Sequence, residues 1–521
     1  MSVTRRAALG RSFALAAGAA AFLNARPSRS AEPVHFNADP FKLGVASGDP
    51  TPDGFVLWTR LAPNPFEPDG GMGDQVVQVQ WFVAADEKFK TLLRAGSEIA
   101  HPERGHAVHV ELTGLTPGRP YWYGFEAGGV RSPAGRAVTL PAAGAPVSSF
   151  KFGWTSCQHF EQGFFNAYKD MVAWNPDLIL HLGDYIYESS FGQQIRRHPN
   201  LDPRTLDDYR VHHAVYKLDE DLQAAHRHTT WALIWDDHDV SNDYAGLTPA
   251  NPADLEGFPA RRAAAYQAWF ENLPIGRRSL VSRGETRIYQ QLLIGDLLQI
   301  AMLDNRQYRT PRACVDPAKW RTTLKVCPDN AAPGRTVLGA EQEHWLGETL
   351  DHSTTRWTAI AQQTMFSHFF QKTATGEYGA YQDGWSAYPA ARQAILDRIA
   401  RRPHQDTVII GGDMHSYFAV DVRAQGEGRA DSPVIASEFV AGSVTTQNYN
   451  YDRWTKTIAE PGNEHIKFFD DRVHGWAAAE VTPARWSVDF RAMSTTWRRD
   501  ATASSLSKWA VEWGRAGVQR A

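Results

Sequence analysis

Hydrophobic and polar positions follow two different patterns along the chain. Between residues 34 and 142, short hydrophobic runs have the length of strands and partly alternate with polar positions, as in 76–83 and 108–112. This period of two is typical of half-buried β-strands. The pattern therefore predicts an all-β N-terminal domain over 34–142, which ends in a linker at 141–149 rich in Ala, Gly and Pro.

From about residue 150 onward, apolar strand-like runs alternate with helical patterns at 164–174 and 261–273. The predicted strands of this region are 150–154, 178–181, 231–235, 297–303, 357–362 and 407–410. Such alternation is typical of a layered α/β domain, which we place at 147–500. Later β-like runs indicate a second sheet packed on the first, and they lie at 417–422, 434–440 and 477–482.

The last stretch, 501–521, is predicted to be a helix. Its apolar side chains are Leu506, Trp509, Val511 and Trp513. Two roles are open for this helix. Its Trp-rich face packs on the core, as in most amphipathic helices, or the helix covers the mouth of the functional site as a lid.

The first 30 residues have the composition of an export signal. Arg5 and Arg6 precede the apolar stretch 13–23, which is too short to span a bilayer, and small residues precede Ala31. The paired arginines resemble a twin-arginine signal, and the alternative is an ordinary secretory signal. We therefore expect a periplasmic or extracellular protein. No later stretch predicts a transmembrane helix.

Net charge limits the possible partners, and the cysteines limit the possible disulfides. The 521 residues carry a net charge of −4, which provides no basic surface for nucleic acid. We expect a monomer that has no nucleic acid-binding module. In an oxidising compartment, Cys314 and Cys327 are candidates for a disulfide, which leaves Cys157 alone after a predicted strand.

Three short motifs carry the candidate chemistry, and each follows a predicted strand. They are Gly183-Asp184-Tyr185-Ile186-Tyr187, Asp236-Asp237-His238-Asp239 and Gly412-Asp413-Met414-His415. Ligands of α/β sheets collect beyond the carboxyl ends of the strands, so we expect these side chains to share one crevice. Together they offer the anionic and imidazole ligands that two adjacent metal ions need. Paired metal ions are a common device for attacking phosphate esters.

Part of this donor set favours a trivalent iron. Asp184 has two carboxylate oxygens and can bridge two cations. Tyr187 offers a phenolate, Cys157 offers a thiolate, and His415 adds a neutral nitrogen. Phenolate and thiolate are strong anionic donors that suit ferric iron. These four residues are therefore candidate iron ligands.

The remaining donors favour a harder divalent ion such as calcium. Asp237 and Asp413 supply carboxylate oxygens, and Asn242 adds a neutral amide oxygen. His238 lies next to a predicted ligand, and we expect it to transfer a proton to the leaving group. Each motif alone has an ordinary explanation, since Asp after a strand often caps a helix and a lone Cys is most often a buried hydrophobe. Their ordered combination favours the metal site.

These motifs resemble those of the calcineurin-like metallophosphoesterases, and among them those of the PhoD-type alkaline phosphatases and phosphodiesterases. The segments that carry the resemblance are 156–158, 183–188, 235–239, 304–309, 383–389 and 412–415. The resemblance implies an α/β fold in which a four-layered α/β/β/α domain follows a small fibronectin III/Ig-like β-sandwich. The segment 115–123 is similar to the tyrosine corner of such sandwiches.

The resemblance also implies the cofactors, one Fe3+ and one or two Ca2+. By match, iron is held by Cys157, Asp184, Tyr187 and His415, and calcium by Asp184, Asp237 and Asp413 with Asn242. The chain departs from the wider superfamily at two places. Asp237 stands where Asn is usual, and 362–364 replaces a second His motif. Both departures add oxygen donors and favour calcium at the second position.

These predictions converge on a secreted, metal-dependent phosphoric ester hydrolase. We expect an alkaline phosphatase with phosphodiesterase activity, in which a metal-bound hydroxide attacks phosphorus in line between metals bridged by Asp184. His238 would protonate the leaving alkoxide, and Arg306 or Arg309 would hold a phosphate oxygen unless these arginines form structural ion pairs. Two other functions stay open: a phospholipase D-like phosphodiesterase, and a secreted surface-binding protein with structural metals.

Overall fold

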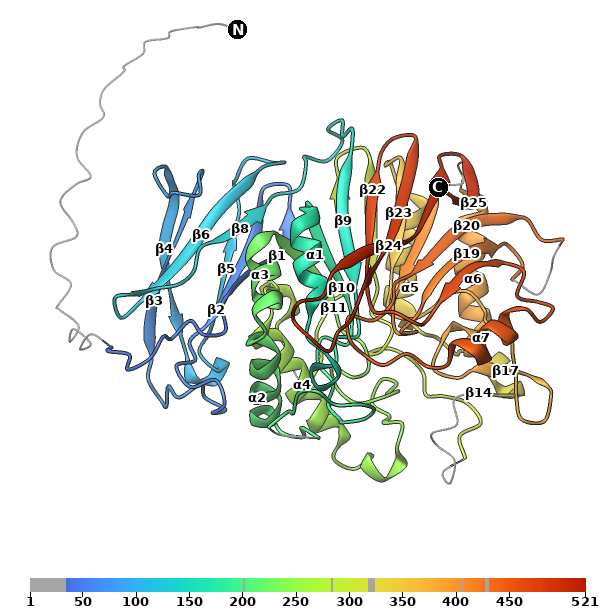
Figure 1. Cartoon of the computed structure of the whole chain (residues 1–521), viewed down its shortest axis with the longest axis horizontal. Helices are drawn as coiled ribbons and strands as arrows, with labels where there is room; N and C mark the ends of the chain where they lie inside the picture. The colour runs from blue at the N-terminus through green and yellow to red at the C-terminus, as the bar shows by residue number, and fades with distance from the viewer. Residues whose placement is uncertain are drawn as a thin grey trace, which may run out of the picture. The chain divides into compact units, whose positions relative to one another are not determined.

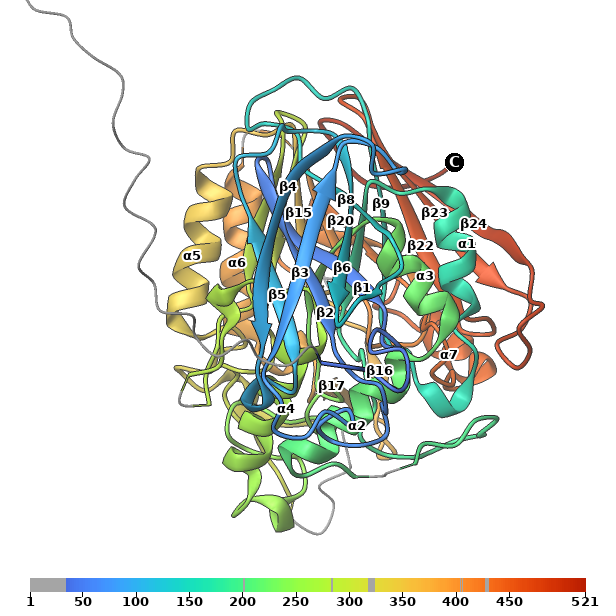
Figure 2. The same cartoon turned by 90° about the vertical axis from the view of Figure 1, so that its left-hand side faces the viewer.

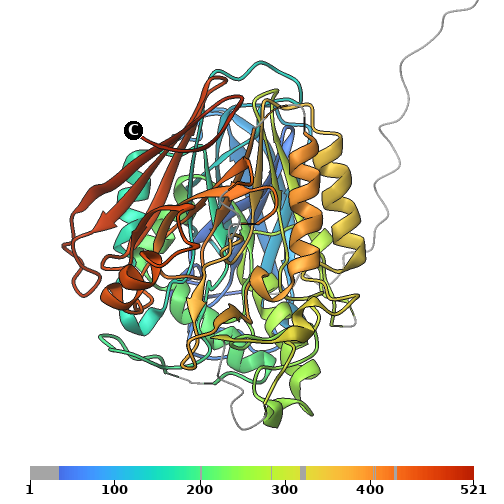
Figure 3. The same cartoon turned by 90° about the vertical axis from the view of Figure 1, so that its right-hand side faces the viewer.

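Two large β-sheets lie against each other, and helices cover their outer faces (Figures 1 and 3). The computed structural model describes residues 34–521 except 200, 201, 283, 317–323, 403, 405 and 427–430. The predicted signal peptide at 1–30 therefore lies outside the described residues. The layers follow the order helix, sheet, sheet, helix, which is the predicted four-layered architecture.

The first sheet contains ten strands and runs through the centre of the fold. In spatial order the strands are β25 (Arg515–Arg520), β24 (Ala503–Glu512), β23 (Arg485–Met493), β22 (Gly475–Val481), β9 (Phe150–Thr155), β10 (Leu178–Leu182), β11 (Thr230–Ile234), β1 (Val45–Thr51), β2 (Gly54–Arg60) and β5 (Ala107–Leu112). β10 pairs in parallel with both β9 and β11. These three neighbours therefore point their carboxyl ends toward the same edge.

The second sheet contains seven strands. In spatial order they are β12 (Gln290–Ile294), β13 (Leu298–Met302), β15 (Trp357–Ala361), β18 (Thr407–Gly411), β20 (Val434–Val440), β19 (Tyr417–Arg423) and β21 (Ile466–Asp470). β13, β15, β18 and β20 are parallel to one another. The predicted strands of the α/β region are thus confirmed, and they divide between two sheets.

Two smaller sheets and the helices complete the described fold. The smaller sheets are β4 (Leu92–Ala100), β3 (Val77–Ala84), β6 (Pro120–Ala127), β7 (Val130–Arg131) and β8 (Gly135–Val138), and β14 (Leu324–Lys325), β17 (Tyr378–Tyr381) and β16 (Gln371–Lys372). The α-helices are α1 (Asn166–Trp174), α2 (Leu206–Lys217), α3 (Glu220–His228), α4 (Phe258–Asn272), α5 (Gly339–Asp351), α6 (Pro389–Arg401) and α7 (Tyr451–Ile458). Figure 2 shows α5 and α6 on one side of the sheets and α1 and α3 on the other.

The composition of the central strands explains their position. Every residue of β10 and β11 is buried, and both strands are almost wholly apolar. Continuous apolar runs are typical of parallel strands that are covered on both faces. Trp154 of β9 and Ile410 of β18 belong to the same hydrophobic core, and the indole nitrogen of Trp154 donates to the carbonyl oxygen of Gly411 at 3.3 Å. The two sheets are therefore joined by packing and by a direct hydrogen bond.

The N-terminal segment contributes strands to two sheets (Figure 2). β3, β4, β6, β7 and β8 form a five-stranded sheet, whereas β1, β2 and β5 extend the ten-stranded sheet beyond β11. β1 pairs with β11 in parallel at Gly48 and Trp231. The predicted sandwich is present, but one of its layers continues into the large sheet.

The predicted tyrosine corner is formed as expected. The hydroxyl of Tyr121 donates to the carbonyl oxygen of Thr116 at 2.9 Å and accepts from its backbone N–H at 2.7 Å. Tyr121 is 1% exposed. A buried phenol needs such partners, because an unpaired buried hydroxyl is costly. This contact fixes the loop between β5 and β6.

The predicted C-terminal helix at 501–521 is wrong. The segment forms the antiparallel strands β24 and β25, and β24 pairs with β23 along the edge of the ten-stranded sheet. Ser507 and Trp509 are buried on either side of the exposed Lys508, which is the alternation of a strand, and Ala510 and Val511 are both buried. The spacing of Leu506, Trp509 and Trp513 also fits a helix, and the unpaired edge of β23 decided between the two. The proposed helical lid is therefore absent from the described residues.

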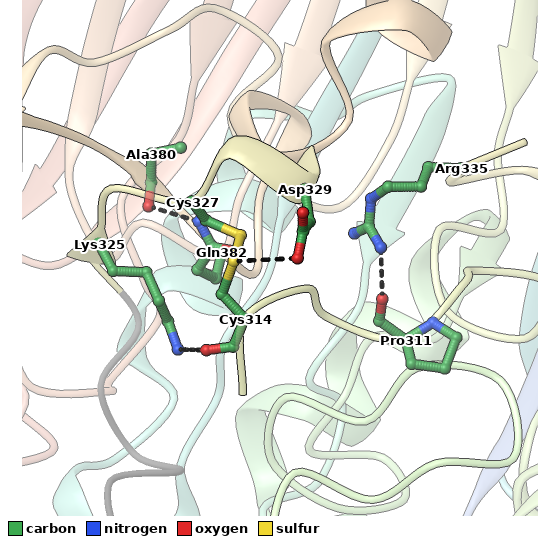
Figure 4. Close-up of a disulfide and its surroundings, with 8 residues drawn as sticks. All are labelled: Pro311, Cys314, Lys325, Cys327, Asp329, Arg335, Ala380 and Gln382. Atoms are coloured by element: carbon green, nitrogen blue, oxygen red, sulfur yellow. Dashed lines mark hydrogen bonds between the residues drawn. A yellow bond between two sulfur atoms is a disulfide. The ribbon is translucent and has the colours of Figure 1, made fainter. Parts of the chain in front are cut away.

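Cys314 and Cys327 form a disulfide, as the sequence suggested (Figure 4). The amine of Lys325 donates to the carbonyl oxygen of Cys314 at 2.9 Å, so hydrogen bonding reinforces the bridge. Closing so short a loop stabilises a folded protein by about 3 kcal/mol in the chain-entropy model. β14 next to the bridge pairs with β17, which connects this loop to the body of the protein.

Candidate metal centre

The carboxyl ends of strands from both large sheets meet in one region. Cys157 follows β9, Asp184 follows β10, Asp237 follows β11, and Asp413 follows β18. The carboxamide of Gln363 connects the two sheets at this edge, because it donates to the carbonyl oxygens of Trp235 at 2.7 Å and Leu303 at 3.0 Å. The predicted crevice at the strand ends is therefore formed by both sheets.

Two glycines of the motifs allow this close approach. A Cβ atom at Gly412 would lie 2.2 Å from the hydroxyl oxygen of Ser156. A Cβ atom at Gly183 would lie 2.4 Å from Cβ of Asp236, and Gly183 also has a φ of +112°. No side chain fits at either position without moving the neighbouring strand end.

The backbone is strained at four of the predicted ligands. Cys157, Asp184, Asp413 and His415 have φ angles of 58°, 54°, 59° and 49°. Positive φ is uncommon for residues with a Cβ atom and costs of order 1–3 kcal/mol each. Such strain persists only where the surroundings impose it, and it is often found at functional sites. The concentration at these four positions indicates a site whose geometry is set by its function.

The predicted iron ligands lie together. Cys157, Asp184 and His415 each offer a ligand atom, and these atoms lie within 4.8 Å of one another. The hydroxyl of Tyr187 is 2.7 Å from Oδ2 of Asp184 and 3.2 Å from Nε2 of His415. Nδ1 of His415 is 3.0 Å from the carbonyl oxygen of Gln447, which leaves Nε2 directed at the other donors.

The predicted calcium ligands form overlapping groups beside the first. Asp184, Asp237 and His238 bring ligand atoms within 4.8 Å of one another, and so do Asp236, Asp237 and Asp413. Asp184 therefore belongs to both groups, as a bridging carboxylate requires. Sequence reasoning assigned no ligand role to Asp236.

Two further acidic residues were missed as ligand candidates. Asp243 and Asp383 form a third group with Asp237, again within 4.8 Å. Asp243 directly follows the predicted ligand Asn242, and Asp383 begins one of the quoted motifs, so both signals were present in the sequence. Their distance from Asp237 depends on loop conformation, which the motifs do not specify. Asp243 has a φ of 53°.

Asn242 lines the cavity next to these carboxylates. Its backbone N–H donates to Oε1 of Glu188 at 2.8 Å. The next backbone N–H, of Asp243, donates to Oδ2 of Asp237 at 2.6 Å. The loop is therefore held against the acidic cluster through its backbone.

The electrostatics of the cluster fit a cation. Burial raises the pKa of Asp184 and of Asp413 well above the usual value, and neighbouring carboxylates raise it further. Burial and the charges of Asp184 and Asp413 raise the pKa of the Cys157 thiol as well. Oδ2 of Asp413 is buried without a hydrogen-bond partner among the described residues. Uncompensated buried acids and an orphaned oxygen are features that bound metal ions remove.

The imidazole of His415 suits metal ligation for the same reason. Burial, together with the nearby His238, lowers the pKa of His415 to about 3, so its ring is neutral at ordinary pH. A neutral imidazole is the form that binds metals. His415 and the three anionic donors around it therefore match the ligand set expected for iron.

His238 is held in one orientation by a carboxylate. Its Nδ1 lies 2.7 Å from Oε2 of Glu188, and its backbone N–H donates to Oδ1 of Asp184 at 3.2 Å. Burial would lower the pKa of His238, but the charges of Glu188, Asp237 and Asp184 outweigh it and raise the pKa well above the usual value. Glu188 was not predicted, although it ends the motif 183–188. The ring can therefore carry a proton next to the predicted metal ligands.

Arg306 does not reach the position expected for a substrate-binding residue. Its side chain is 0% exposed. The guanidinium pairs with Asp236, with Asp237 at 3.2 Å and with Asp383 at 2.6 Å. We therefore correct the expectation that it holds a phosphate oxygen, because all of its described partners are carboxylates of the cluster.

Arg309 is placed similarly. Its guanidinium donates to Oδ1 of Asp383 at 2.9 Å and to the carbonyl oxygen of Asn305 at 2.8 Å. Arg306 keeps the cluster together electrostatically, since it and His238 hold the pKa of Asp237 at about 2 against the effect of burial. The geometry of both arginines favours structural ion pairs over phosphate binding.

A cavity of about 800 Å³ borders the cluster. The predicted site residues Asp184, Asp237, His238, Asn242, Asp413 and His415 line it, and Arg306 does not. Aromatic side chains form another part of its wall, and these are Phe191, Tyr381, Tyr449 and Trp454. Polar and aromatic walls around convergent charged groups are typical of a binding site for a small organic ligand.

Comparison with known proteins identifies the family. Residues 152–490 match the model of the PhoD-like phosphatase family, and residues 27–141 match its PhoD-like phosphatase N-terminal domain. The chain belongs to the PhoD-like phosphatase family. It is 38% identical to alkaline phosphatase D of Bacillus subtilis (strain 168) over 496 residues, which cover 93% of this chain and 83% of the relative. A solved structure of PhoD superimposes with a TM-score of 0.88, 38% identity and coverage of 94% and 93% of the two chains.

Family membership identifies this PhoD-like phosphatase as a phosphoric ester hydrolase. The buried acidic, histidine and cysteine side chains described above are its candidate metal ligands. Among the described residues, no helix combines the length and the apolar composition needed to cross a bilayer. The family implies a phosphoester substrate.

The buried position of Arg306 leads to a stability prediction. Replacing Arg306→Met removes the guanidinium from Asp236 and Asp237 and leaves Asp383 paired with Arg309 alone. We expect a loss of about 3 kcal/mol in the free energy of unfolding. Urea denaturation of the purified phosphatase measures it. Arg204→Gln is the control, since Arg204 is 52% exposed and its ion pairs are worth about 1 kcal/mol or less. Unchanged stability of Arg306→Met with a raised KM would restore the substrate-binding role.

Proposed function

We propose that this PhoD-like phosphatase holds Fe3+ through Cys157, Asp184, Tyr187 and His415. Thiolate, phenolate, carboxylate and neutral imidazole are a donor set that suits ferric iron. The proximity of Cys157, Asp184 and His415 carries this proposal.

Calcium is the second proposed cofactor. Asp237 and Asp413 supply carboxylate oxygens, Asp184 is shared with the iron ligands, and Asn242 and Asp243 add oxygen donors from the adjoining loop. Oxygen ligands from carboxylates and amides are those that Ca2+ prefers. The calcium group contains no thiol, and its one imidazole, that of His238, is assigned to proton transfer. The two ions are therefore distinguished by the chemistry of their ligands.

The proposed reaction is the hydrolysis of phosphate mono- and diesters by in-line attack of water on phosphorus. When bound, a metal pair polarises the phosphoryl group and lowers the pKa of a coordinated water. His238 then gives a proton to the oxygen of the leaving group. Glu188 holds the ring through Nδ1, so that Nε2 is free to face the cavity. The backbone N–H of His238 also donates to Oδ1 of Asp184, which holds His238 at a second point.

Diester hydrolysis is included because the cavity extends beyond the cluster. At about 800 Å³, it has room for an ester with substituents on both sides of phosphorus. A phospholipase D-like specificity remains the nearest alternative, and it would need a long apolar surface for the lipid chains. The aromatic wall offers part of such a surface, so assays with short-chain and lipid diesters separate the two.

His238 is expected to matter most for esters with poor leaving groups. His238→Asn should lower kcat about 100-fold for phenyl phosphate, which needs protonation of its leaving oxygen. The loss should be much smaller for p-nitrophenyl phosphate, because p-nitrophenolate leaves without a proton. Steady-state assays of both monoesters, and of the corresponding diesters, provide the comparison.

Asp184→Asn is the control for this experiment. It removes the bridging carboxylate and is expected to abolish hydrolysis of all of these esters. Equal losses for good and poor leaving groups in His238→Asn would exclude the role of general acid. Full hydrolysis by Asp184→Asn would instead exclude a catalytic need for the bridging carboxylate.

The iron proposal predicts a coloured protein. Donation from a phenolate or thiolate to Fe3+ gives a visible charge-transfer band, and Tyr187→Phe should weaken or shift it. Tyr449→Phe is the matched control, because the Tyr449 ring stacks on His415 at 5.3 Å but is not a proposed ligand. Absorption spectra and metal analysis of the three proteins test the assignment. A colourless, iron-free and fully active enzyme would overturn it.

We also propose export through a twin-arginine signal to the periplasm or the cell exterior. The support is the arginine pair in 1–30 and the disulfide between Cys314 and Cys327, which an oxidising compartment favours. Joint replacement of Arg5→Lys and Arg6→Lys should retain activity in the cytoplasm, as cell fractionation would measure. Arg11→Lys is the matched control and should be exported. Export of the double variant would contradict the proposal.

A further inference from the structure

Arg453 lies on α7, at the wall of the cavity that contains the metal ligands. Its side chain is exposed. Unlike the arginine buried under the cluster, it borders the space into which an ester must enter. A cation at this position can contact a substrate, whereas the buried arginine contacts only the carboxylates of the cluster.

The guanidinium of Arg453 makes no hydrogen bond or ion pair within the described part of the chain. The other arginines of the cavity wall are paired. Arg204 contacts Asp202 at 2.8 Å and Asp254 at 3.1 Å, and Arg261 contacts Asp202 at 3.0 Å. The charge of Arg453 is therefore available to a ligand.

The base of this side chain is firmly held. The backbone N–H of Arg453 donates to Oδ1 of Asn450, which caps the N-terminus of α7, at 2.9 Å. The neighbouring Trp454 is 8% exposed and packs in a hydrophobic cluster. The ring of Tyr449 stacks on Trp454 at 5.2 Å and on the proposed metal ligand His415 at 5.3 Å. Aromatic packing thus links the position of α7 to the metal centre.

A free guanidinium on a fixed helix is suited to an anion. Its planar fork forms paired hydrogen bonds with phosphate or carboxylate oxygens. In the proposed function, the metal ions bind the phosphoryl group that is attacked. The anion left for Arg453 is therefore a second one, on the organic part of the ester.

We propose that Arg453 is a specificity-determining residue that binds a second anionic group of the substrate. The preferred substrates are phosphoesters that carry another phosphate or a carboxylate beyond the scissile bond. This inference rests on the proposed phosphoesterase function and names the class of ester that the cavity selects. The interaction is expected to strengthen binding and to leave the chemical step unchanged.

Two chromogenic diesters that differ in one group provide the test. They are thymidine 5′-(p-nitrophenyl phosphate) and the same compound with an additional 3′-phosphate. Arg453→Gln should lower kcat/KM for the 3′-phosphorylated ester about tenfold, mainly through KM, because a charge-assisted hydrogen-bond pair is lost. For the ester without the 3′-phosphate the change should be less than about twofold. Arg453→Lys should recover part of the preference.

Lys456→Gln is the matched control. Lys456 lies on the same helix and is also exposed, but it does not line the cavity. This variant removes the same charge from α7 and should leave the ratio of the two kcat/KM values unchanged. The wild-type preference for the 3′-phosphorylated ester should also fall as the salt concentration rises, since salt screens an exposed ion pair.

The outcomes distinguish this inference from the proposed function. If the wild type hydrolyses neither diester nor the simple monoesters, the proposed function fails. If it hydrolyses them and Arg453→Gln affects both diesters equally, Arg453 contacts the scissile phosphate and the inference is overturned. An unchanged ratio in Arg453→Gln, or an equal change in Lys456→Gln, overturns it as well.

Discussion

The fold depends on how it accommodates a group of acidic side chains buried where two sheets meet. Asp236, Asp237 and Asp383 surround the fully buried guanidinium of Arg306. Burying even one unpaired carboxylate is costly, because it loses its hydration without gaining a partner. The arginine compensates the acids from the side of the core. On the cavity side, burial raises the pKa of Asp184 and Asp413 well above the usual value, and Arg306 approaches Asp413 only to 4.0 Å. A further positive charge there would favour the ionised carboxylates.

This arrangement explains the backbone at the site. The ligands must come from the ends of strands in two different sheets, and each end must turn its side chain toward one point. Cys157, Asp184, Asp413 and His415 do so with positive φ angles. The unfavourable conformations are held by the buried strands before them and by close contacts such as Gly412 against Ser156. Stability of the sheets is thus used to fix geometry at their ends.

The sequence predicted the parts of the fold in which local pattern and tertiary contacts agree. Apolar runs gave the central strands, because 178–182 and 230–234 are buried on both faces whatever pairs with them. The pattern at 501–521 fits both a helix and a strand, and only the open edge of β23 selects the strand. The ligand motifs were recognisable by residue type. The partners of Arg306 were not, because they lie 69 to 77 residues away along the chain.

The arginines of this protein show why residue type alone did not assign roles. Arg306 lies in a motif and is chemically suited to phosphate, yet three carboxylates already occupy its donors. Arg453 lies in no motif, yet it lines the cavity and its guanidinium has no partner within the described residues. A donor that is already satisfied can only stabilise, whereas an unsatisfied one at a cavity can select a ligand. Burial and existing partners therefore decide which charges support the site and which are available to the substrate.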